Sequence, residues 1–195
     1  MTISAAAILL FLVLDPLGNI LLFTSALQNV PPERRTRVVT RELLIAYAIL
    51  VMFLFVGAPL LRVLNISGPA LTIAGGLVLF LIALRMVFPS FEGIHTEAVR
   101  EEPFIVPLAI PYVAGPSALA TVLLLMSREP ARWPEWLLAL TLAWLASTAI
   151  LSFGSRIGAF LGHKGLVALE RLMGLLLVAV AVQMALEGLR SALRA

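Results

Sequence analysis

The feature that most constrains this chain is an apolar segment, residues 3–28, which could cross a bilayer but holds an acid and a proline at its centre. Asp15 is the only aspartate in the protein. A carboxylate at that depth costs at least ~2.5 kcal/mol, so it indicates a functional site. Pro16 removes the backbone hydrogen bond to the Leu12 carbonyl, and Gly18 adds freedom where the helix is already weakened. We therefore expect a helix break here, with the freed backbone buried in protein or lining a cavity.

The composition predicts a polytopic membrane protein. Hydrophobic residues make up 61% of the 195 residues and charged residues only 13%, whereas a soluble domain is nearer half and a quarter. The net charge of +3 comes mostly from arginines at segment ends, which is typical of topology signals and not of nucleic-acid binding. The absence of cysteine excludes disulfide and thiol chemistry. Because a basic n-region is lacking, we read the first segment as a spanning helix and not as a cleaved signal peptide.

Apolar segments of about 20 residues predict an all-α fold with six transmembrane helices in a single membrane domain, residues 1–195. The expected spans are about 3–28, 43–63, 70–88, 103–127, 136–155 and 168–188. A polar connection, residues 29–42, follows the first span; the longest polar loop covers about 89–102, and a glycine-rich connection around Gly158–Gly165 precedes the last span. The odd-numbered loops and their flanks carry nine basic residues and the other side five. This bias predicts cytoplasmic odd loops and extracytoplasmic termini, in the cell (inner) membrane.

The two halves of the chain resemble each other. Gly76 aligned with Gly174 pairs eleven residues without a gap, Gly-Leu-Val-Leu-Phe-Leu-Ile-Ala-Leu-Arg-Met beside Gly-Leu-Leu-Leu-Val-Ala-Val-Ala-Val-Gln-Met. The same alignment pairs Met86 with Met184. The broken first segment then corresponds to a fourth segment that also carries helix breakers, namely Pro107, Pro111, Gly115 and Pro116.

This correspondence predicts two inverted repeats, about 1–88 and about 103–190. A unit of three spans is odd, so its second copy must enter the membrane from the opposite side. Interrupted helices at corresponding places in inverted halves are the best sequence indication of a transporter's central site. The predicted fold is therefore two inverted three-helix repeats with discontinuous first and fourth helices.

The two breaks differ in the charge they offer. Pro116 is well placed as the first residue of a second half-helix, which leaves the N–H groups of Ser117, Ala118 and Leu119 unpaired at the bilayer centre. Such a helix N-terminus binds anions. Asp15, with the carbonyls freed by Pro16, offers a negative site for an ammonium group, Na⁺ or H⁺. Together they predict a pocket for a zwitterion, and small lining residues limit it to a small amino acid.

Seven residues are predicted to bind the substrate: Asp15, Gly18, Asn19, Gly115, Ser117, Thr121 and Gln183. Three residues are predicted to break the helices: Pro16, Pro111 and Pro116. Competing explanations exist for several of them. Asp15 could lie on a kinked structural helix and pair with an arginine, and Thr121 could bond a carbonyl one turn back. For Gly75 and Gly76 the competing explanation is close helix packing. Glu170 and Arg171 are placed near a membrane interface.

Three motifs resemble the MarC family of bacterial and archaeal membrane proteins. They are Asp-Pro-Leu-Gly-Asn at 15–19, Ile-Pro-Tyr-Val-Ala-Gly-Pro-Ser-Ala at 110–118, and Arg-Leu-Met-Gly at 171–174 with Val-Gln at 182–183. That family is similar in architecture to the LysE-type amino-acid exporters, and its SnatA branch is known to transport small neutral amino acids. The resemblance covers essentially the whole chain and implies six helices and a transport role.

We therefore predict a secondary transporter of small neutral amino acids such as alanine or glycine, coupled to H⁺ or Na⁺. A single aspartate cannot form a protease dyad, neither histidine lies in a span as a base for Ser117, and no P-loop is present, so no enzyme activity is expected. We expect no metal and no cofactor beyond a coupling ion; the expected partners are a small-molecule substrate and the lipid bilayer, without nucleic acid. A passive small-solute channel or a structural membrane subunit is the alternative. The sequence leaves the coupling ion, the direction of transport and the oligomeric state open.

Overall fold

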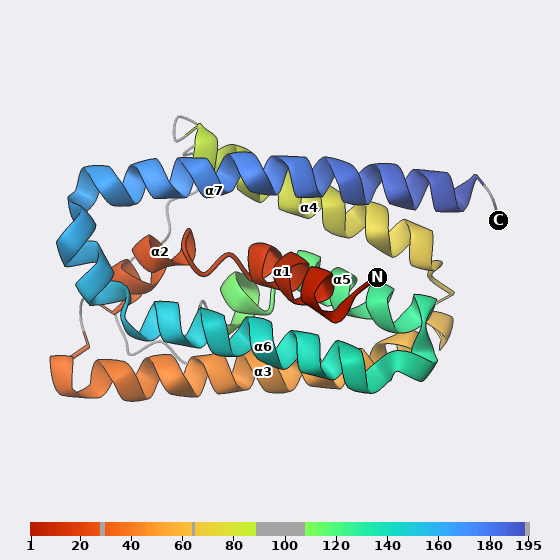
Figure 1. Ribbon diagram of the computed structural model, residues 1–195, viewed down its shortest axis with the longest axis horizontal. Helices are drawn as coiled ribbons and strands as arrows, with labels where there is room; N and C mark the ends of the chain where they lie inside the picture. Colours follow the sequence, from red (N-terminus) through yellow and green to blue (C-terminus); the bar gives the residue numbers. More distant parts are fainter. Residues whose placement is uncertain (28–29, 64, 89–107, 194–195) are drawn as a thin grey trace.

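The computed structural model describes residues 1–27, 30–63, 65–88 and 108–193. Every regular element in these ranges is helical (Figure 1). In chain order they are α1 (Ile3–Leu14), α2 (Asn19–Ala26), α3 (Pro32–Val63), α4 (Gly68–Val87), η2 (Leu108–Val113), α5 (Pro116–Arg128), η3 (Pro130–Arg132), α6 (Trp133–Ser152) and α7 (Gly154–Ala192). The predicted all-α fold is confirmed for this part of the chain. The predicted loop 89–102 and Pro107 lie outside the described residues.

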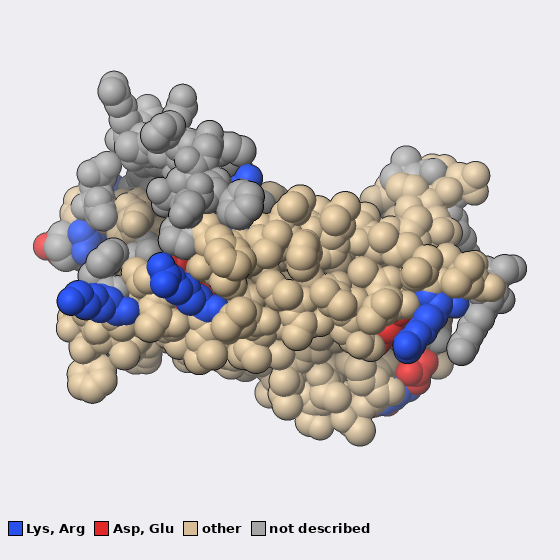
Figure 2. Space-filling model, turned by 90° about the horizontal axis from the view of Figure 1, so that it is seen from above, with Lys and Arg blue, Asp and Glu red and all other residues tan. Residues whose placement is uncertain are grey.

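The helices divide into long and short apolar ones. Four are long and apolar enough to cross a membrane, namely Glu33–Leu61, Gly68–Val87, Pro130–Ser152 and Lys164–Ala192. Two shorter apolar helices, Ile3–Leu14 and Pro116–Ser127, lie where the first and fourth spans are predicted to be broken. On the face seen in Figure 2, a band without charged side chains separates two ends that carry them. These features are those of a multi-pass membrane protein.

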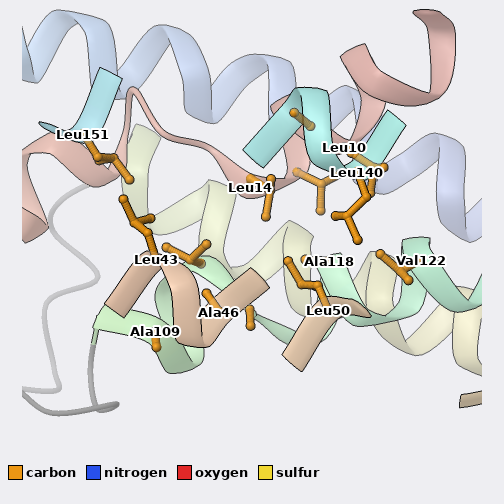
Figure 3. Close-up of a cluster of buried hydrophobic side chains, with 14 of the residues drawn as sticks. Leu10, Leu14, Leu43, Ala46, Leu50, Ala109, Ala118, Val122, Leu140 and Leu151 are labelled. Carbon is orange, nitrogen blue, oxygen red and sulfur yellow. The ribbon is translucent and has the colours of Figure 1, made fainter. Parts of the chain in front are cut away.

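Two pairs of long helices enclose the interrupted ones. α4 packs along α7, and α3 packs along α6, while α1, α2 and α5 lie between the two pairs (Figure 1). α1 contacts α6, and α5 contacts both α3 and α4. Figure 3 shows the buried apolar side chains that join them, such as Leu14 of α1, Leu50 of α3 and Ala118 of α5. This arrangement places the ends of α1 and α5 inside the bundle.

Glycines bring α4 and α7 close together in a reciprocal contact. A Cβ built on Gly76 would lie 3.2 Å from Met184 Cβ, and one built on Gly174 would lie 2.9 Å from Met86 Cβ. The other close neighbours are Ala181 and Ala185 for the first glycine and Ala83 and Val87 for the second. Every contact therefore has its aligned counterpart in the other half, and the two helices run antiparallel. A Cβ built on Gly75 would lie 2.5 Å from Ala120 Cβ of α5. Close packing through small residues, the competing explanation for Gly75 and Gly76, is confirmed.

Polar side chains join α3 to α6. The hydroxyl groups of Tyr47 and Thr141 lie 2.8 Å apart, and Trp144 donates its indole N–H to the Leu43 carbonyl at 2.8 Å. The rings of Tyr47 and Trp144 also contact each other, with centroids 4.7 Å apart. Hydrogen bonds between helices are one of the main sources of association in a membrane, where no hydrophobic force drives helices together.

Two predicted connections prove to be helical. The prediction of a polar connection over residues 29–42 is wrong for the part from Pro32 onward, which forms the first turns of α3. Arginine and glutamate favour helix, so a polar composition alone did not mark a loop. Glu42 in these turns is fully buried and pairs with Arg41 at 2.9 Å. The glycine-rich connection before the last span is also part of α7, interrupted at Gly162, where φ is 65° and ψ is 175°.

Candidate functional site

The first break lies between α1 and α2. Asp15 ends α1 with φ 44° and ψ 56°, a left-handed conformation that Asp tolerates better than most residues. Its N–H donates to the carbonyls of Phe11, at 3.2 Å, and Leu12, at 3.1 Å. The Leu12 carbonyl, which Pro16 was expected to free, therefore has a donor, and that part of the prediction is wrong.

The Asp15 carboxylate caps the turn that follows it. Its Oδ1 accepts the Gly18 N–H at 3.1 Å, and its carbonyl accepts the Asn19 N–H at 3.0 Å. The carboxylate therefore satisfies a backbone N–H of the turn at residues 16–18, which precedes α2, and the N-cap of α2 itself is Gly18. The Asn19 side chain donates to the Leu14 carbonyl at 3.0 Å. Asp15 is 7% exposed, and within the described part of the chain no arginine pairs with it, so the kinked-helix explanation lacks its ion pair.

Gly18 lets α4 approach this break closely. A Cβ at Gly18 would overlap the Asp15 carboxylate and would lie 2.5 Å from Met86 Cε. Glu170 of α7 is near enough to interact electrostatically with Asp15. The sequence analysis placed Glu170 near a membrane interface and did not include it in the site. The available signal was an acid within the last apolar segment. The first break is thus a buried, acidic region bounded by α4 and α7.

The second break lies between η2 and α5. Ile110 is extended, with φ −127° and ψ 129°, which is the conformation a proline favours in the residue before it. The non-helical residue thus directly precedes Pro111. Gly115 is the N-cap of α5 and Pro116 its first residue. The Leu119 N–H, predicted to be unpaired, donates to the Gly115 carbonyl at 3.0 Å, so that part of the prediction is wrong. Because glycine has no side chain, Gly115 cannot cap the first turn of α5 as Asp15 caps its own turn.

The first turns of α5 are buried against α4. Ser117 is 3% exposed and Thr121 is 1% exposed. A Cβ at Gly75 would lie 2.5 Å from Ala120 Cβ and 3.8 Å from Ser117 Cα. The Thr121 hydroxyl donates to the Ser117 carbonyl at 2.8 Å, which is the competing explanation for that residue. Since α4 also contacts the first break, both breaks pack against the same helix.

The structure does not group every predicted site residue. Asp15, Gly18 and Asn19 share the first break, and Gly115, Ser117 and Thr121 share the second. Gln183 is instead an exposed residue of α7, and its amide donates to Glu187 at 2.8 Å. Among the residues described, no three His, Asp or Glu side chains are grouped so as to hold a metal ion.

Comparison with known protein families gives a match to almost the whole chain. The family model described as MarC family integral membrane protein matches residues 1–193. This chain belongs to the MarC family. The resemblance drawn from the three motifs is thereby confirmed.

Curated relatives match along nearly their whole length. The UPF0056 inner membrane protein YhgN of Escherichia coli (strain K12) is 48% identical over 189 residues, which covers 96% of each chain. A UPF0056 membrane protein of Buchnera aphidicola subsp. Schizaphis graminum is 44% identical over 97% of this chain and 96% of its own. One from Pyrococcus abyssi is 30% identical over 94% and 92%. No solved structure matches the chain.

Proposed function

We propose that this protein is a secondary transporter of small neutral amino acids, such as alanine or glycine, coupled to H⁺ or Na⁺. One observation carries the proposal: two apolar segments are interrupted at buried points, one holding a carboxylate and the other a helix N-terminus without a side-chain cap. Broken helices inside a bundle are how many secondary transporters build their substrate sites. The relatives are described as membrane proteins, which agrees with this role.

The two breaks suit the two ends of an amino acid. The substrate carboxylate accepts hydrogen bonds from the N–H groups of Ser117 and Ala118, where the helix dipole supplies about half a positive charge. The ammonium group lies toward Asp15, with Glu170 adding negative charge nearby. Small residues such as Gly75 and Ala120 pack closely beside the second break, and we expect a site there to take only a small side chain.

We also propose that the six spans form two inverted repeats around the breaks. The reciprocal contacts of Gly76 and Gly174 support this, because equivalent antiparallel helices meet in that way across a two-fold axis in the membrane plane. The first span packs on α6 through α1, and the fourth span packs on α3 through η2 and α5. Each interrupted span therefore contacts the corresponding long helix of the other half. The charge bias places the odd loops in the cytoplasm and both termini outside, in the inner membrane named for the E. coli relative.

Counterflow and uptake in proteoliposomes test the proposal. Proteoliposomes that contain the purified protein and are loaded with unlabelled alanine should accumulate labelled alanine or glycine. An imposed H⁺ or Na⁺ gradient should drive the internal concentration of label above the external one. Asp15→Asn should abolish gradient-driven uptake, whereas Glu187→Gln, an acid in the last turns of α7, should not. Ser117→Leu should abolish flux in a protein that still folds.

Three results would contradict the proposal in different ways. Flux without accumulation would indicate a passive channel, and absence of flux would indicate a structural subunit. Counterflow that is unchanged in Asp15→Asn would show that the first break does not form part of the substrate site.

A further inference from the structure

We infer that Met86 and Met184 are the specificity-determining residues of this transporter, and that they exclude larger neutral amino acids from the two breaks. The inference rests on the proposed function and names two residues that sequence reasoning used only to align the halves.

Each methionine is anchored at the α4–α7 contact. The Cβ of Met86 lies against Gly174, and the Cβ of Met184 lies against Gly76, with no room for a further carbon at either glycine. Helix backbones on both sides hold these first side-chain atoms in place. The base of each methionine is therefore fixed by the interface between the two long helices.

The free end of each methionine reaches a break. Met86 Cε would lie 2.5 Å from a Cβ at Gly18, directly beside the Asp15 carboxylate. Met184 Cε would lie 3.4 Å from a Cβ at Gly75, and that same Cβ would lie 2.5 Å from Ala120 Cβ and 3.8 Å from Ser117 Cα. One methyl group thus faces the acidic break, and the other lies at the contact between α4 and the first turns of α5.

Methionine is suited to limit size without blocking the site. Its unbranched thioether has three rotatable bonds and can move aside for a small solute, but its volume must still be accommodated. An apolar tip also makes no hydrogen bond to the charged ends of the substrate, so it discriminates between side chains and not between charges. The two tips, one at the first break and one where α4 meets the first turns of α5, limit the size of the substrate side chain at both ends of the proposed site.

Substrate competition in proteoliposomes tests the inference. The uptake of labelled alanine, valine and leucine is compared in wild type, Met86→Ala and Met184→Ala, with Met52→Ala as the matched control because Met52 is half exposed on α3. Either site variant should raise the leucine-to-alanine ratio of uptake efficiency about tenfold or more, the scale on which a hydrophobic pocket distinguishes side chains. The control should leave the ratio unchanged. Met86→Leu, which nearly conserves volume, should keep wild-type selectivity.

The ratio does not depend on the fraction of folded protein, so a loss of yield in one variant does not obscure the result. Met86→Phe gives the opposite test, since it should reduce alanine uptake more than glycine uptake. Unchanged ratios in both alanine variants, with a wild type that transports alanine, would overturn the inference and leave the proposed function standing. A wild type that transports neither alanine nor glycine would overturn the proposed function, and the inference with it.

Discussion

The two helix breaks each have a proline directly after one key residue, and they differ in that residue and in its backbone conformation. Pro16 follows Asp15, which is left-handed with φ 44° and ψ 56°, and lies in the turn before α2. Pro116 follows Gly115, which is extended with φ −80° and ψ 168°, and is the first residue of α5. The carboxylate accepts a backbone N–H of its own turn, whereas the glycine leaves the first turn of α5 without a cap. The comparison teaches that the residue before the proline, a carboxylate in one break and a glycine in the other, gives the two breaks opposite charge.

The change with the largest expected effect gives the second helix break the acid of the first. In Gly115→Asp, the new carboxylate should accept the N–H groups of the first turn of α5 and compete with the substrate. Hydrogen bonds to charged groups contribute ~1.5–3 kcal/mol, so the apparent affinity for alanine should fall at least about tenfold. Concentration-dependent uptake in proteoliposomes measures it. Gly68→Asp, which adds an acid to the first turn of α4 instead, is the control; equal affinities in the two variants would contradict the assignment.

A second change, Gly18→Ala, fills the space between the Asp15 carboxylate and Met86 at the first break. A side chain in Gly18→Ala would overlap the Asp15 carboxylate and press on Met86. Overpacking of this kind costs about 1–3 kcal/mol, and the thermal unfolding temperature in detergent should fall accordingly. Gly68→Ala is the control, because nothing lies within 4 Å of a Cβ there. If both variants unfold at the wild-type temperature, the close approach of α4 to the first break is wrong.

A third change tests the side-chain amide of Asn19 in the first break. Asn19 donates to the Leu14 carbonyl, so Asn19→Ala leaves a buried acceptor without that donor. The expected loss of stability is about 1–2 kcal/mol. Chemical denaturation in detergent measures the change, with Thr24→Ala, an exposed hydroxyl on the same helix, as the reference. A loss no larger than that of the reference would show that this bond does not hold the break.

The smallest effect concerns Glu129, whose carboxylate lies in solvent, in contrast to the buried Asp15. The hydrogen bond from Arg132 lowers the pKa of Glu129, and the Met1 amino group acts in the same direction. The contribution of Glu129 to stability is complete above its ordinary pKa of 4.5 and is lost as the pH falls through the lower folded value. Thermal unfolding should therefore show a small acid-dependent loss that Arg132→Gln reduces. The effect is small because the groups are exposed, and an identical pH profile in the variant would refute it.

Much of the fold was predictable because prolines and glycines act locally. The start of α5 at Pro116 and the end of α1 at Leu14 follow from the geometry that proline imposes on its neighbours. The bounds of α4 match the predicted span closely for a similar reason, since Ser67 caps it. Local signals of this kind do not depend on what the rest of the chain does.

Other features depend on contacts that no local pattern reveals. The repeat alignment gave Gln183 a position in the chain but not the face of α7 on which it lies, and that face is exposed. The carboxylate of Glu170, 155 residues further along the chain, interacts electrostatically with Asp15, and only packing brings the two acids near each other. The donor to the Leu12 carbonyl depends on the left-handed turn at Asp15, which Pro16 alone did not predict.

The central claim is tested most directly by an experimental structure of the protein with bound alanine. The account predicts the alanine carboxylate within hydrogen-bond distance of the N–H groups of Ser117 and Ala118, and its ammonium group on the side of Asp15. Alanine bound elsewhere in a protein that is active in counterflow, with both breaks empty, would contradict it.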